Sequence, residues 1–567
     1  MANVKGDRDH PLKQAVHSVR SAFRSAALFS AAINILMLTG PVFMLQVYDR
    51  VLASRSVPTL VAIAGLAAGM YLFLGLFEFI RARVLSRAGY RLEQRLSSPL
   101  FNHYVTAGAS SAREIARPLQ ELAVLRQFLT SPGFTGLFDL PWVPFYLAIV
   151  FLLHPWLGLL ALGGAAMVFI FALANEMMSR EALSRAMLLE YSEAQLADAS
   201  HRHGEALMAM GMTGHVERRW RRVHDEAGWN AQKGGERAEV FASASKATRM
   251  LLQSSILGLG SYLAILQEIT PGMIIAGSII AGRALAPVDV TIGQWRAIKR
   301  ARGAYGRLKG ILQAAEGEAE TTELPEPEGR LHVEGITIFA SSEPGAERRP
   351  ILAQISFALE PGDALGVIGA SAAGKTTLAR ALTGVRVPDA GAVRLDGARL
   401  DHWNREALGR HVGYLPQNVE LLSGSVRDNI ARFDDTASDE EVIAAAKLAG
   451  VHDLILRLPD GYATRTGLGA RTILSGGQIQ RIALARAVFR TPKLVVLDEP
   501  NSNLDAEGDA ALAGAIEALR AGGSTIVVMA HRPSAIAAVN KVLMLVNGMV
   551  AEFGEKAEVL QKVTRRG

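Results

Sequence analysis

Four short segments in the later part of this chain carry residue types that bind phosphate and activate water. The first is a glycine-rich loop, Gly369-Ala-Ser-Ala-Ala-Gly-Lys-Thr376, and the second is the pentapeptide LSGGQ at 474–478. The third is the acid pair Asp498-Glu499 after an apolar run, and the fourth is His531 after another apolar run. Each segment alone is weak evidence, but their order predicts chemistry on the terminal phosphate of a nucleotide.

The glycine-rich loop has the flanking pattern of a phosphate-binding loop. It follows an apolar strand pattern at 364–368 and precedes a helical pattern that begins at Thr377. Glycines let the backbone N–H groups surround phosphate oxygens, and the helix N-terminus adds the positive end of its dipole. Lys375 is expected to reach the β- and γ-phosphates, and Thr376 to bind Mg2+. The residues predicted to hold ATP are Gly369, Ala370, Ser371, Ala372, Ala373, Gly374, Lys375, Thr376 and Thr377.

Four further side chains are predicted to act on the metal and the attacking water. Asp498 ends an apolar strand, which suits a carboxylate that binds Mg2+ together with Thr376 and Gln417. Glu499 is placed to polarise the water, and the Gln417 amide follows another apolar strand and can contact the metal or the water. His531 is predicted to hydrogen-bond the γ-phosphate. An acid pair at a strand end is often only solvated and a lone histidine is usually structural, but the upstream loop favours catalysis.

The pentapeptide LSGGQ predicts a helix start that faces a phosphate. Ser475 is a natural N-cap, and Gly476 and Gly477 permit close backbone approach. With Gln478, these residues are predicted to present N–H groups and a hydroxyl to a γ-phosphate. The chain's own phosphate loop lies about a hundred residues earlier, too far across one fold to be the partner. We therefore expect a homodimer in which LSGGQ faces the ATP of a second copy.

Composition places part of this chain in a lipid bilayer. Its 567 residues predict two or three domains, and 50% of them are hydrophobic, concentrated before residue 290. Arginines crowd beside apolar runs rather than along a soluble basic stripe, which argues against a nucleic-acid partner. There is no cysteine, which excludes disulfides, thiolate metal sites and a cysteine nucleophile. The polar N-terminus resembles no signal peptide, so we expect it in the cytoplasm.

Six apolar runs are long enough to predict membrane-spanning helices, at 26–47, 59–80, 136–153, 156–175, 248–266 and 272–290. His154-Pro155 separates the third and fourth runs, which predicts a tight helical hairpin, and 267–271 predicts a short turn between the last two. The long segments 81–135 and 176–247 are rich in arginine, which places them in the cytoplasm. Breaks at 108–118 and 208–214 predict a helix–turn–helix in each.

The domain prediction follows from these patterns. We expect a cytoplasmic segment at 1–20, a six-span helical transmembrane domain at 21–312, a linker at 313–329 that is acidic and proline-rich, and a nucleotide-binding domain at 330–567. The last domain alternates short β-type runs with helical ones, which predicts an α/β fold with a largely parallel core sheet. The predicted strands are 352–358, 364–369, 392–395, 411–415, 494–498 and 525–530, with a hairpin turn at Asn547-Gly548.

Residues 330–560 resemble the ATP-binding cassette family. The resemblance rests on the phosphate loop, Gln417, LSGGQ, Asp498-Glu499, Ser502-Asn-Leu-Asp505 and His531. It implies that Asp505 also contributes to the nucleotide site. Six spans ahead of one cassette look like an exporter half that works as a homodimer and sandwiches ATP between the loop of one copy and the LSGGQ of the other.

The membrane part resembles type I secretion ATPases of the protease and lipase exporter kind. The matching segments are Val47-Tyr-Asp-Arg-Val51, Asp139-Leu-Pro-Trp142, Ala209-Met-Gly-Met212 and Gly282-Arg-Ala-Leu-Ala-Pro287. The resemblance implies a bacterial inner-membrane protein that exports unfolded polypeptides with a C-terminal signal. Its implied partners are a periplasmic adaptor and an outer-membrane tunnel protein.

Three other functions share parts of the pattern that indicates polypeptide export. A lipid or drug exporter would use the same ATPase and stays open as the alternative. An exporter that also cleaves leader peptides would need a catalytic cysteine, which this chain lacks. A soluble DNA-repair ATPase with LSGGQ is excluded by six apolar runs of spanning length.

Arg283 lies inside the last apolar run, where burial of its charge costs roughly 2.5–3.5 kcal/mol on insertion scales. It should therefore face the bundle interior or an aqueous path. One hypothesis is that Arg283 lines the polypeptide route, and the other is that it pairs with an acid such as Glu78.

Overall fold

The computed structural model describes residues 11–110, 118–315, 324–340, 349–467, 472, 474–531 and 533–566. The chain folds into two compact units. Within the described residues, the first is helical and covers 11–105 and 118–315, and the second is an α/β unit that covers 106–110 and the residues from 324 on. The predicted linker at 313–329 is described only in part, since 316–323 lie outside the described residues.

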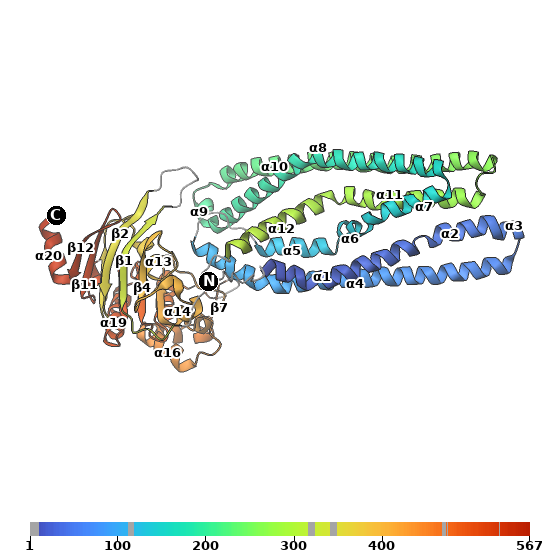
Figure 1. The fold of residues 1–567 in the computed structure, drawn as a ribbon. Coiled ribbons are helices and arrows are strands. Elements are labelled where there is room, and N and C mark those ends of the chain that lie inside the picture. The colour runs from blue at the N-terminus through green and yellow to red at the C-terminus, as the bar shows by residue number, and fades with distance from the viewer. Residues whose placement is uncertain are drawn as a thin grey trace, which may run out of the picture. The chain divides into compact units, whose positions relative to one another are not determined.

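The helical unit consists of long helices with short connectors (Figure 1). Its elements are α1 (Pro11–Leu36), α2 (Thr39–Gln46), the π-helical turn η1 (Val47–Val51), α3 (Leu52–Ser54), α4 (Val57–Ser110), α5 (Pro118–Leu129), α6 (Pro132–Asp139), the 3-10 turn η2 (Leu140–Trp142), α7 (Val143–Leu153), α8 (Pro155–Arg202), α9 (Gly204–Ala209), α10 (Thr213–Ile265), α11 (Pro271–Gly293) and α12 (Trp295–Ala315). The helices α4, α8 and α10 have 54, 48 and 53 residues. At a rise of 1.5 Å per residue each is over about 70 Å long, more than twice the thickness of a bilayer's hydrocarbon core.

Five helical stretches within the described residues are long and apolar enough to cross a membrane: Gln14–Ser54, Val57–Thr106, Pro132–Leu153, Pro155–Arg202 and Pro271–Gly293. They contain five of the six predicted runs. The sixth run, 248–266, forms the end of α10. Because the helix ends at Ile265, a stretch of spanning length must begin among more polar residues, and its mean hydropathy is lower. A stretch of 18 residues ending there includes Arg249, Gln253 and three serines. Length and hydropathy alone therefore do not reproduce the predicted count of six.

The predicted turns of the helical unit are present. His154 alone separates α7 from α8, and its side chain accepts a hydrogen bond from the Trp156 N–H as the N-cap of α8. Thr270 caps α11 in the same way, before Pro271 at the first helical position. The break predicted at 208–214 lies between α9 and α10, whereas most of the break at 108–118 falls on residues 111–117, outside the described part.

Two motifs of the membrane part hold helices of this unit together. Asp139 accepts hydrogen bonds from Arg81 on α4 (3.1 Å) and from Asn34 on α1 (2.9 Å). Asp49, within η1, accepts one from the N–H of Gly272 at the first turn of α11 (2.8 Å). A Cβ at Gly272 would lie 2.7 Å from that carboxylate. The small residue therefore lets Asp49 reach the helix N-terminus, where negative charge is stabilised.

The α/β unit contains two main sheets. Six strands run in the order β12-β11-β3-β10-β9-β6 and four in the order β2-β1-β4-β5. The strands are β1 (Leu331–Phe339), β2 (Pro350–Leu359), β3 (Ala364–Ile368), β4 (Ala390–Leu395), β5 (Ala398–Arg399), β6 (Val412–Leu415), β9 (Leu494–Asp498), β10 (Thr525–Ala530), β11 (Lys541–Val546) and β12 (Met549–Glu555), with a separate small pair, β7 (Gly424–Ser425) and β8 (Arg465–Thr466).

The prediction of a largely parallel core sheet is confirmed. β11, β3, β10, β9 and β6 pair in parallel, and β12 closes one edge as an antiparallel strand. The predicted strands 352–358 and 392–395 do not belong to this core, because β2 and β4 both pair antiparallel with β1 in the second sheet. The turn at Asn547-Gly548 joins β11 to β12 with positive φ at both residues, as a tight hairpin turn requires.

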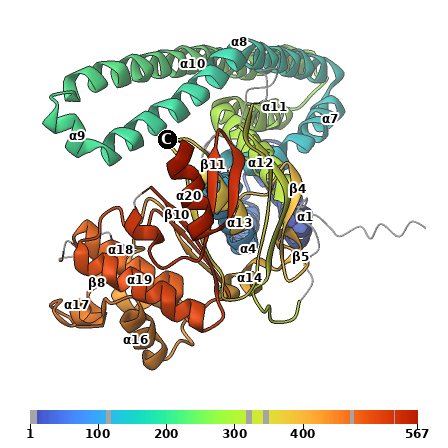
Figure 2. The same ribbon diagram turned by 90° about the vertical axis from the view of Figure 1, so that its left-hand side faces the viewer.

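Helices lie beside the core sheet (Figure 2). They are α13 (Lys375–Leu382), η3 (Leu400–His402), α14 (Arg405–His411), α15 (Val426–Ile430), α16 (Asp439–Leu448), α17 (His452–Leu456), η4 (Gly461–Ala463), α18 (Gly476–Val488), α19 (Ala506–Ala521), η5 (Pro533–Ile536) and α20 (Lys556–Arg566). One face of the sheet packs on α15, α16, α18 and α19, and the other packs on α13 and the antiparallel sheet. Both faces are therefore buried, which explains the continuous apolar runs of β9 and β10.

Candidate nucleotide-binding site

Strand order brings the predicted site residues to one edge of the core sheet. The strands β3, β10, β9 and β6 are neighbours and run parallel, so their carboxyl ends meet at the same edge. The glycine-rich loop follows β3, His531 follows β10, Asp498 ends β9 and Gln417 comes shortly after β6. A cavity of about 290 Å3 lies there, lined by Ile351, 371–377, Gln417 and Glu499. The glycine-rich loop, Gln417, the acid pair and His531, each of which follows a core strand, thus lie at the same edge of the sheet.

The glycine-rich loop has the backbone conformation that its sequence predicts. Gly374 has φ +102°, and a Cβ there would lie 2.7 Å from the Leu352 side chain. A Cβ at Gly369 would lie 2.5 Å from the carbonyl oxygen of Leu545. Lys375 is buried, and its ammonium group donates to the carbonyl oxygens of Gly369 (2.7 Å) and Ala370 (3.1 Å). This arrangement keeps a positive charge within the glycine-rich loop, which suits phosphate.

Asp498 has the properties of a residue that binds a cation. It is 1% exposed, and neither carboxylate oxygen has a hydrogen-bond partner of ordinary geometry within the described residues. Burial raises the pKa of Asp498, while the nearby Thr376 hydroxyl opposes that rise. A buried carboxylate without partners is expensive unless a cation compensates it. Asp498 and Thr376 therefore fit Mg2+, whose preferred ligands are hard oxygens.

Glu499 lies between two of the side chains predicted to act with it. The Gln417 amide donates to its Oε2 at 3.0 Å, and Nδ1 of His531 lies 3.6 Å from its Oε1. Its backbone has φ +51°, and its N–H donates to the carbonyl oxygen of Met529 on β10 (3.1 Å). Residues other than glycine rarely adopt this backbone conformation, and those that do are concentrated at functional sites. The structure thus brings Glu499, Gln417 and His531 together in one group.

LSGGQ begins α18, and Ser475 caps the helix as predicted. The Ser475 hydroxyl accepts from the Gln478 N–H (3.3 Å), and the Ser475 N–H donates to Oε1 of Gln478 (2.8 Å), which is a complete capping box. Gly477 permits close approach of the backbone at Asn503, whose carbonyl oxygen a Cβ would meet at 2.9 Å. No residue of 474–478 lines the cavity at the glycine-rich loop, within the described part of the protomer. The predicted phosphate contact of LSGGQ therefore needs a second copy and stays a prediction.

Asp505 serves inside the protomer as a helix cap. Its carboxylate accepts from the Gly508 N–H at the start of α19 (2.8 Å) and from Arg481 on α18 (2.5 Å). The Gly508 N–H and Arg481 both lower the pKa of Asp505. Asp505 is not among the residues that line the cavity, so its predicted role toward the nucleotide stays a prediction that depends on the second copy.

One residue near the site was missed in the sequence. Gln480 is buried on α18, and its amide donates to the carbonyl oxygen of Pro500 (2.5 Å) and accepts from the Asn503 N–H (3.1 Å). It therefore fixes the segment after Glu499 against the helix that begins with LSGGQ. A polar side chain on the buried face of an apolar helix was the available signal.

Arg283 lies on α11 in the helical unit, with its side chain exposed in the single protomer. Its Nη1 lies 3.8 Å from the sulfur of Met37. The described residues contain no ion pair between Arg283 and Glu78, so the pairing hypothesis finds no support, and the route hypothesis stays a prediction.

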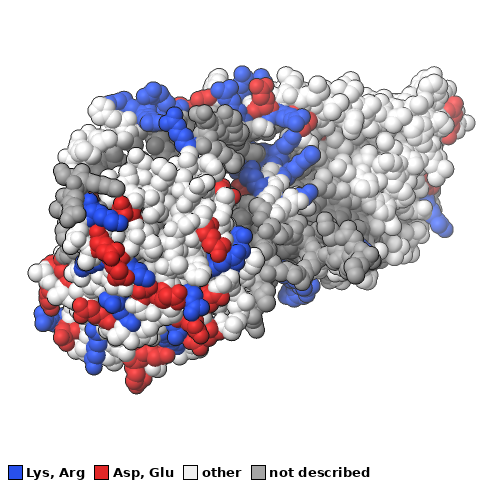
Figure 3. All heavy atoms as spheres, turned by 60° about the vertical axis from the view of Figure 1, so that its left-hand side comes forward, with Lys and Arg blue, Asp and Glu red and all other residues white. Residues whose placement is uncertain are grey.

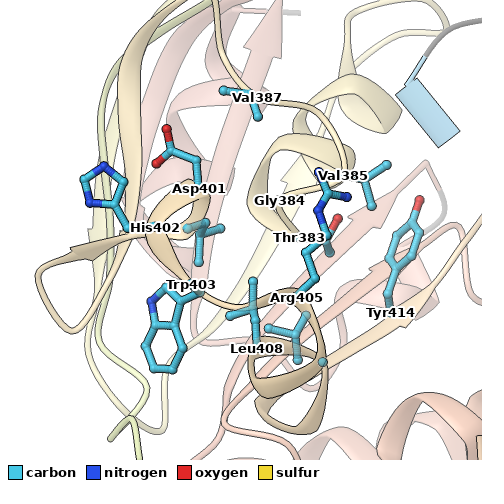
Figure 4. Close-up of a pocket in the computed structure, with 13 residues that line it drawn as sticks. Thr383, Gly384, Val385, Val387, Asp401, His402, Trp403, Arg405, Leu408 and Tyr414 are labelled. Atoms are coloured by element: carbon cyan, nitrogen blue, oxygen red, sulfur yellow. The ribbon is translucent and has the colours of Figure 1, made fainter. Parts of the chain in front are cut away.

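A larger cavity of about 620 Å3 lies elsewhere in the α/β unit. It is bounded by the segment after α13, by η3 and α14, and by β6, with Trp403, Leu408 and Tyr414 around it (Figure 4). Its lining has neither a glycine-rich loop nor the acid pair, so it differs in kind from the nucleotide site.

Comparison with known proteins places both units in one family. Residues 352–502 match the family described as ABC transporter, and residues 25–282 match the ABC transporter transmembrane region. The type I secretion system ATP-binding protein PrsD of Rhizobium meliloti (strain 1021) is 44% identical over 100% of this chain and 96% of its own. The leukotoxin translocation ATP-binding protein LktB of Mannheimia glucosida is 29% identical over 96% of this chain and 77% of its own.

A solved structure of a bacterial Atm1-family ABC exporter with ATP bound has the same fold. It has a TM-score of 0.77, covers 96% of both chains and is 22% identical in sequence. Its two-unit architecture matches the fold predicted from the sequence.

A helical membrane unit fused to a phosphate-loop ATPase unit defines an ATP-driven membrane transporter. This chain belongs to the ABC transporter family, and it is an ATPase that binds ATP. The predicted resemblance to type I secretion ATPases is confirmed by the similarity to PrsD over the whole chain.

Proposed function

We propose that the protein exports unfolded polypeptides as the energising component of a type I secretion system. The observation that carries this proposal is the 44% identity to a type I secretion ATP-binding protein over the full chain, membrane part included. The membrane part decides the cargo, because the ATPase part is shared by exporters of many kinds. The cargo is proposed to carry a C-terminal signal.

The proposed partners follow from this function. Two copies form a homodimer, with the ATPase units in the cytoplasm and the helices in the bacterial inner membrane. A broad uncharged surface of the helical unit is visible in Figure 3 and suits contact with lipid. A periplasmic adaptor and an outer-membrane tunnel protein complete the proposed export route.

The proposed mechanism assigns each side chain of the site a task. The glycine-rich loop and Lys375 hold the phosphates, and Ser475 to Gln478 of the second copy close over the γ-phosphate. Asp498 and Thr376 would hold Mg2+, which would offset the negative charge of the phosphates. Glu499 takes the proton of the attacking water, and the Gln417 amide keeps its carboxylate oriented. His531, whose Nδ1 lies 3.6 Å from the same carboxylate, hydrogen-bonds the γ-phosphate.

The proposed sequence of events links these tasks to transport. Binding of ATP closes the two ATPase units, and that closure opens the helices outward. Hydrolysis then separates the ATPase units and resets the cycle.

The substitution Glu499→Gln tests the proposed base. The amide keeps the shape of the side chain but cannot accept the proton, so turnover is expected to fall by about 100- to 10,000-fold. ATP binding should persist, so the variant should retain ATP after gel filtration. Glu420→Gln, an exposed acid in the loop after Gln417, should hydrolyse ATP at the wild-type rate. Normal turnover in Glu499→Gln would remove Glu499 as the base.

The cargo is tested separately with purified protein in lipid. A C-terminal segment of a polypeptide secreted by the same cell should stimulate ATP hydrolysis. Stimulation by lipids or small amphiphiles, without any response to such a segment, would instead identify a lipid or drug exporter.

A further inference from the structure

The guanidinium of Arg432, a half-buried residue, lies among backbone carbonyl groups of the α/β unit. Nη1 donates to the carbonyl oxygens of Gly409 (2.6 Å) and Val412 (3.2 Å). Nε donates to that of Arg486 (2.9 Å), and Nη2 to that of Ala487 (2.9 Å). One side chain thus joins the end of α14, the start of β6 and the last turn of α18.

These acceptors suit a cation, although no carboxylate is among them. Arg486 and Ala487 belong to the last turn of α18, where carbonyl groups lack helical partners and carry the negative end of the dipole. Burial, together with the neighbouring Arg486 and Arg490, lowers the pKa of Arg432 to about 10, so it stays charged at neutral pH. An apolar side chain in this place would leave these carbonyl groups without the donors that Arg432 supplies. The guanidinium therefore satisfies these acceptors and fixes their positions relative to one another.

The place where Arg432 binds is a close crossing of two backbones. A Cβ at Gly413 on β6 would lie 2.1 Å from the carbonyl oxygen of Ala487 on α18. Leu408, Gly409 and Val412 of the same segment also line the 620 Å3 cavity (Figure 4). Because this segment borders open space there, its position depends on its remaining contacts, among them those with Arg432.

Asn429, near the end of α15, forms hydrogen bonds that join this helix to two other segments of the chain. Its amide donates to the carbonyl oxygen of Leu422 and to the Thr466 hydroxyl (both 3.0 Å), and it accepts from the Leu422 N–H (2.9 Å). Leu422 follows the Gln417 loop, and Thr466 in β8 lies shortly before LSGGQ in the sequence. Asn429 therefore hydrogen-bonds α15 to the segment that follows Gln417 and to the segment that precedes LSGGQ.

We propose that Arg432 is a positioning residue for ATP hydrolysis, because it fixes the start of β6 against the end of α18. β6 leads to Gln417, which contacts Glu499, and α18 begins at LSGGQ. Arg432 thereby sets the distance between the Gln417 amide and the LSGGQ segment that faces the second copy. The inference rests on the proposed roles of Gln417 and LSGGQ.

The test compares Arg432→Gln with Arg490→Gln in the full-length protein in lipid. Arg490 lies two residues after α18 and makes exposed ion pairs with Asp434 and Glu441, so it controls for loss of a guanidinium in the same region. Arg432→Gln should lower kcat by about 10- to 100-fold, the size of effect that a displacement near 1 Å can cause. KM for ATP should stay within about twofold, because Arg432 contacts no residue of the glycine-rich loop. Arg490→Gln should match the wild type in both constants.

A distance measurement separates positioning from general loss of stability. The chain has no cysteine, so Glu406→Cys on α14 and Lys447→Cys on α16, both exposed, can carry two spin labels at defined sites. The label-to-label distance distribution should broaden in Arg432→Gln and stay narrow in Arg490→Gln. Arg432→Lys, which keeps the charge but not the forked donors, should show an intermediate distribution and intermediate kcat.

Each outcome decides between the alternatives. Unchanged kcat and an unchanged distance distribution in Arg432→Gln would overturn the inference. A lowered kcat with an unchanged distribution would also overturn it, because the defect would then not be one of position. If Arg432→Gln does not fold, the two readouts are taken from Arg432→Lys, and wild-type values there would overturn the inference. Failure of the proposed site itself would show instead as normal turnover in Glu499→Gln.

Discussion

Two residues of the nucleotide site are held in states that are unfavourable for the protein without its ligands. Asp498 is a buried carboxylate whose oxygens lack ordinary hydrogen-bond partners in the described structure. Glu499, the next residue, has a strained backbone. Such features lower stability and persist where the surrounding fold enforces them. The rigid strand β9, buried along its whole length, is what enforces them here.

The substitution Asp498→Asn should therefore stabilise the protein when Mg2+ and ATP are absent. Burial raises the folded-state pKa of Asp498 above its unfolded value, so the folded state binds the proton more tightly. This contribution to stability falls as pH rises from the unfolded pKa, near 3.9, through the raised folded pKa. At pH 7 the variant should melt about 2–4 °C above the wild type, corresponding to about 1 kcal/mol, by scanning fluorimetry in detergent. Added Mg2+ and ATP should reverse the order, because the variant loses the metal ligand.

The control for this prediction is Asp401→Asn. Arg399 lowers the pKa of Asp401, so loss of that carboxylate should leave the melting temperature unchanged or lower it. A melting temperature of Asp498→Asn below that of the wild type between pH 5 and pH 8 would contradict the prediction.

Ala372 gives a second prediction within the glycine-rich loop. It has φ +65°, and a left-handed conformation costs a residue with a Cβ about 1–2 kcal/mol. Ala372→Gly relieves that strain, while the added freedom of the unfolded chain offsets about 0.4–1 kcal/mol. The variant should be as stable as the wild type or up to about 1 kcal/mol more stable, with an unchanged KM for ATP. Ala373→Gly, which removes a buried methyl group, should lower the melting temperature, and equal losses in both variants would refute the strain argument.

At the scale of elements, close contacts hold the two long helices α8 and α10 of the membrane unit together. Gly234 on α10 is buried against Leu183 on α8, and a Cβ there would lie 2.9 Å from that side chain. Gly164 on α8 makes a similar approach to Leu252 on α10, at 2.5 Å. Small residues at such crossings allow helix backbones to approach closely.

A pair of neighbouring glycines tests this packing. Gly234→Val should destabilise the α8–α10 contact by about 1–3 kcal/mol, the usual penalty for overpacking. Gly235 has nothing within 4 Å of the position of a Cβ, so Gly235→Val should be neutral or slightly stabilising in the helix. Thermal unfolding of both variants in detergent gives the comparison. The same melting temperature for both would show that Leu183 moves aside without penalty.

At the scale of the whole molecule, one exposed charge on α11 provides a test of the export route. Arg283 is exposed in the protomer, while Gly282 and Ala284 beside it are buried. Arg283→Glu should lower cargo export by about tenfold, equivalent to about 1.4 kcal/mol, and should leave assembly and basal ATP hydrolysis unchanged. Arg283→Lys should keep export close to normal. Export is measured as cargo in the medium of intact cells, and loss of the folded protein in Arg283→Glu would identify a structural role instead.

The local geometry around the candidate nucleotide site could be predicted from the sequence because it is specified by short segments. A loop between a strand and a helix, acids at the end of an apolar run and a serine before Gly-Gly each specify a short-range geometry. The cap at Ser475, the hairpin turn at Asn547-Gly548 and the parallel sheet all follow from such patterns, and all are present. Gln480 was missed because its partners lie some 20 residues further along the chain, beyond β9.

Local patterns were enough to predict most of the helices, many of the strands, the ATPase motifs and the membrane character of the first half, since strand and helix periodicity and hydropathy are properties of short segments. The choice of strands in the core sheet, and hence the meeting of Gln417, Asp498, Glu499 and His531 at one edge, depends on the three-dimensional packing. That packing alone also placed the guanidinium of Arg432 on four carbonyl groups from three separate elements. Pairing between distant segments depends on the packing of the whole unit, and no local pattern encodes it.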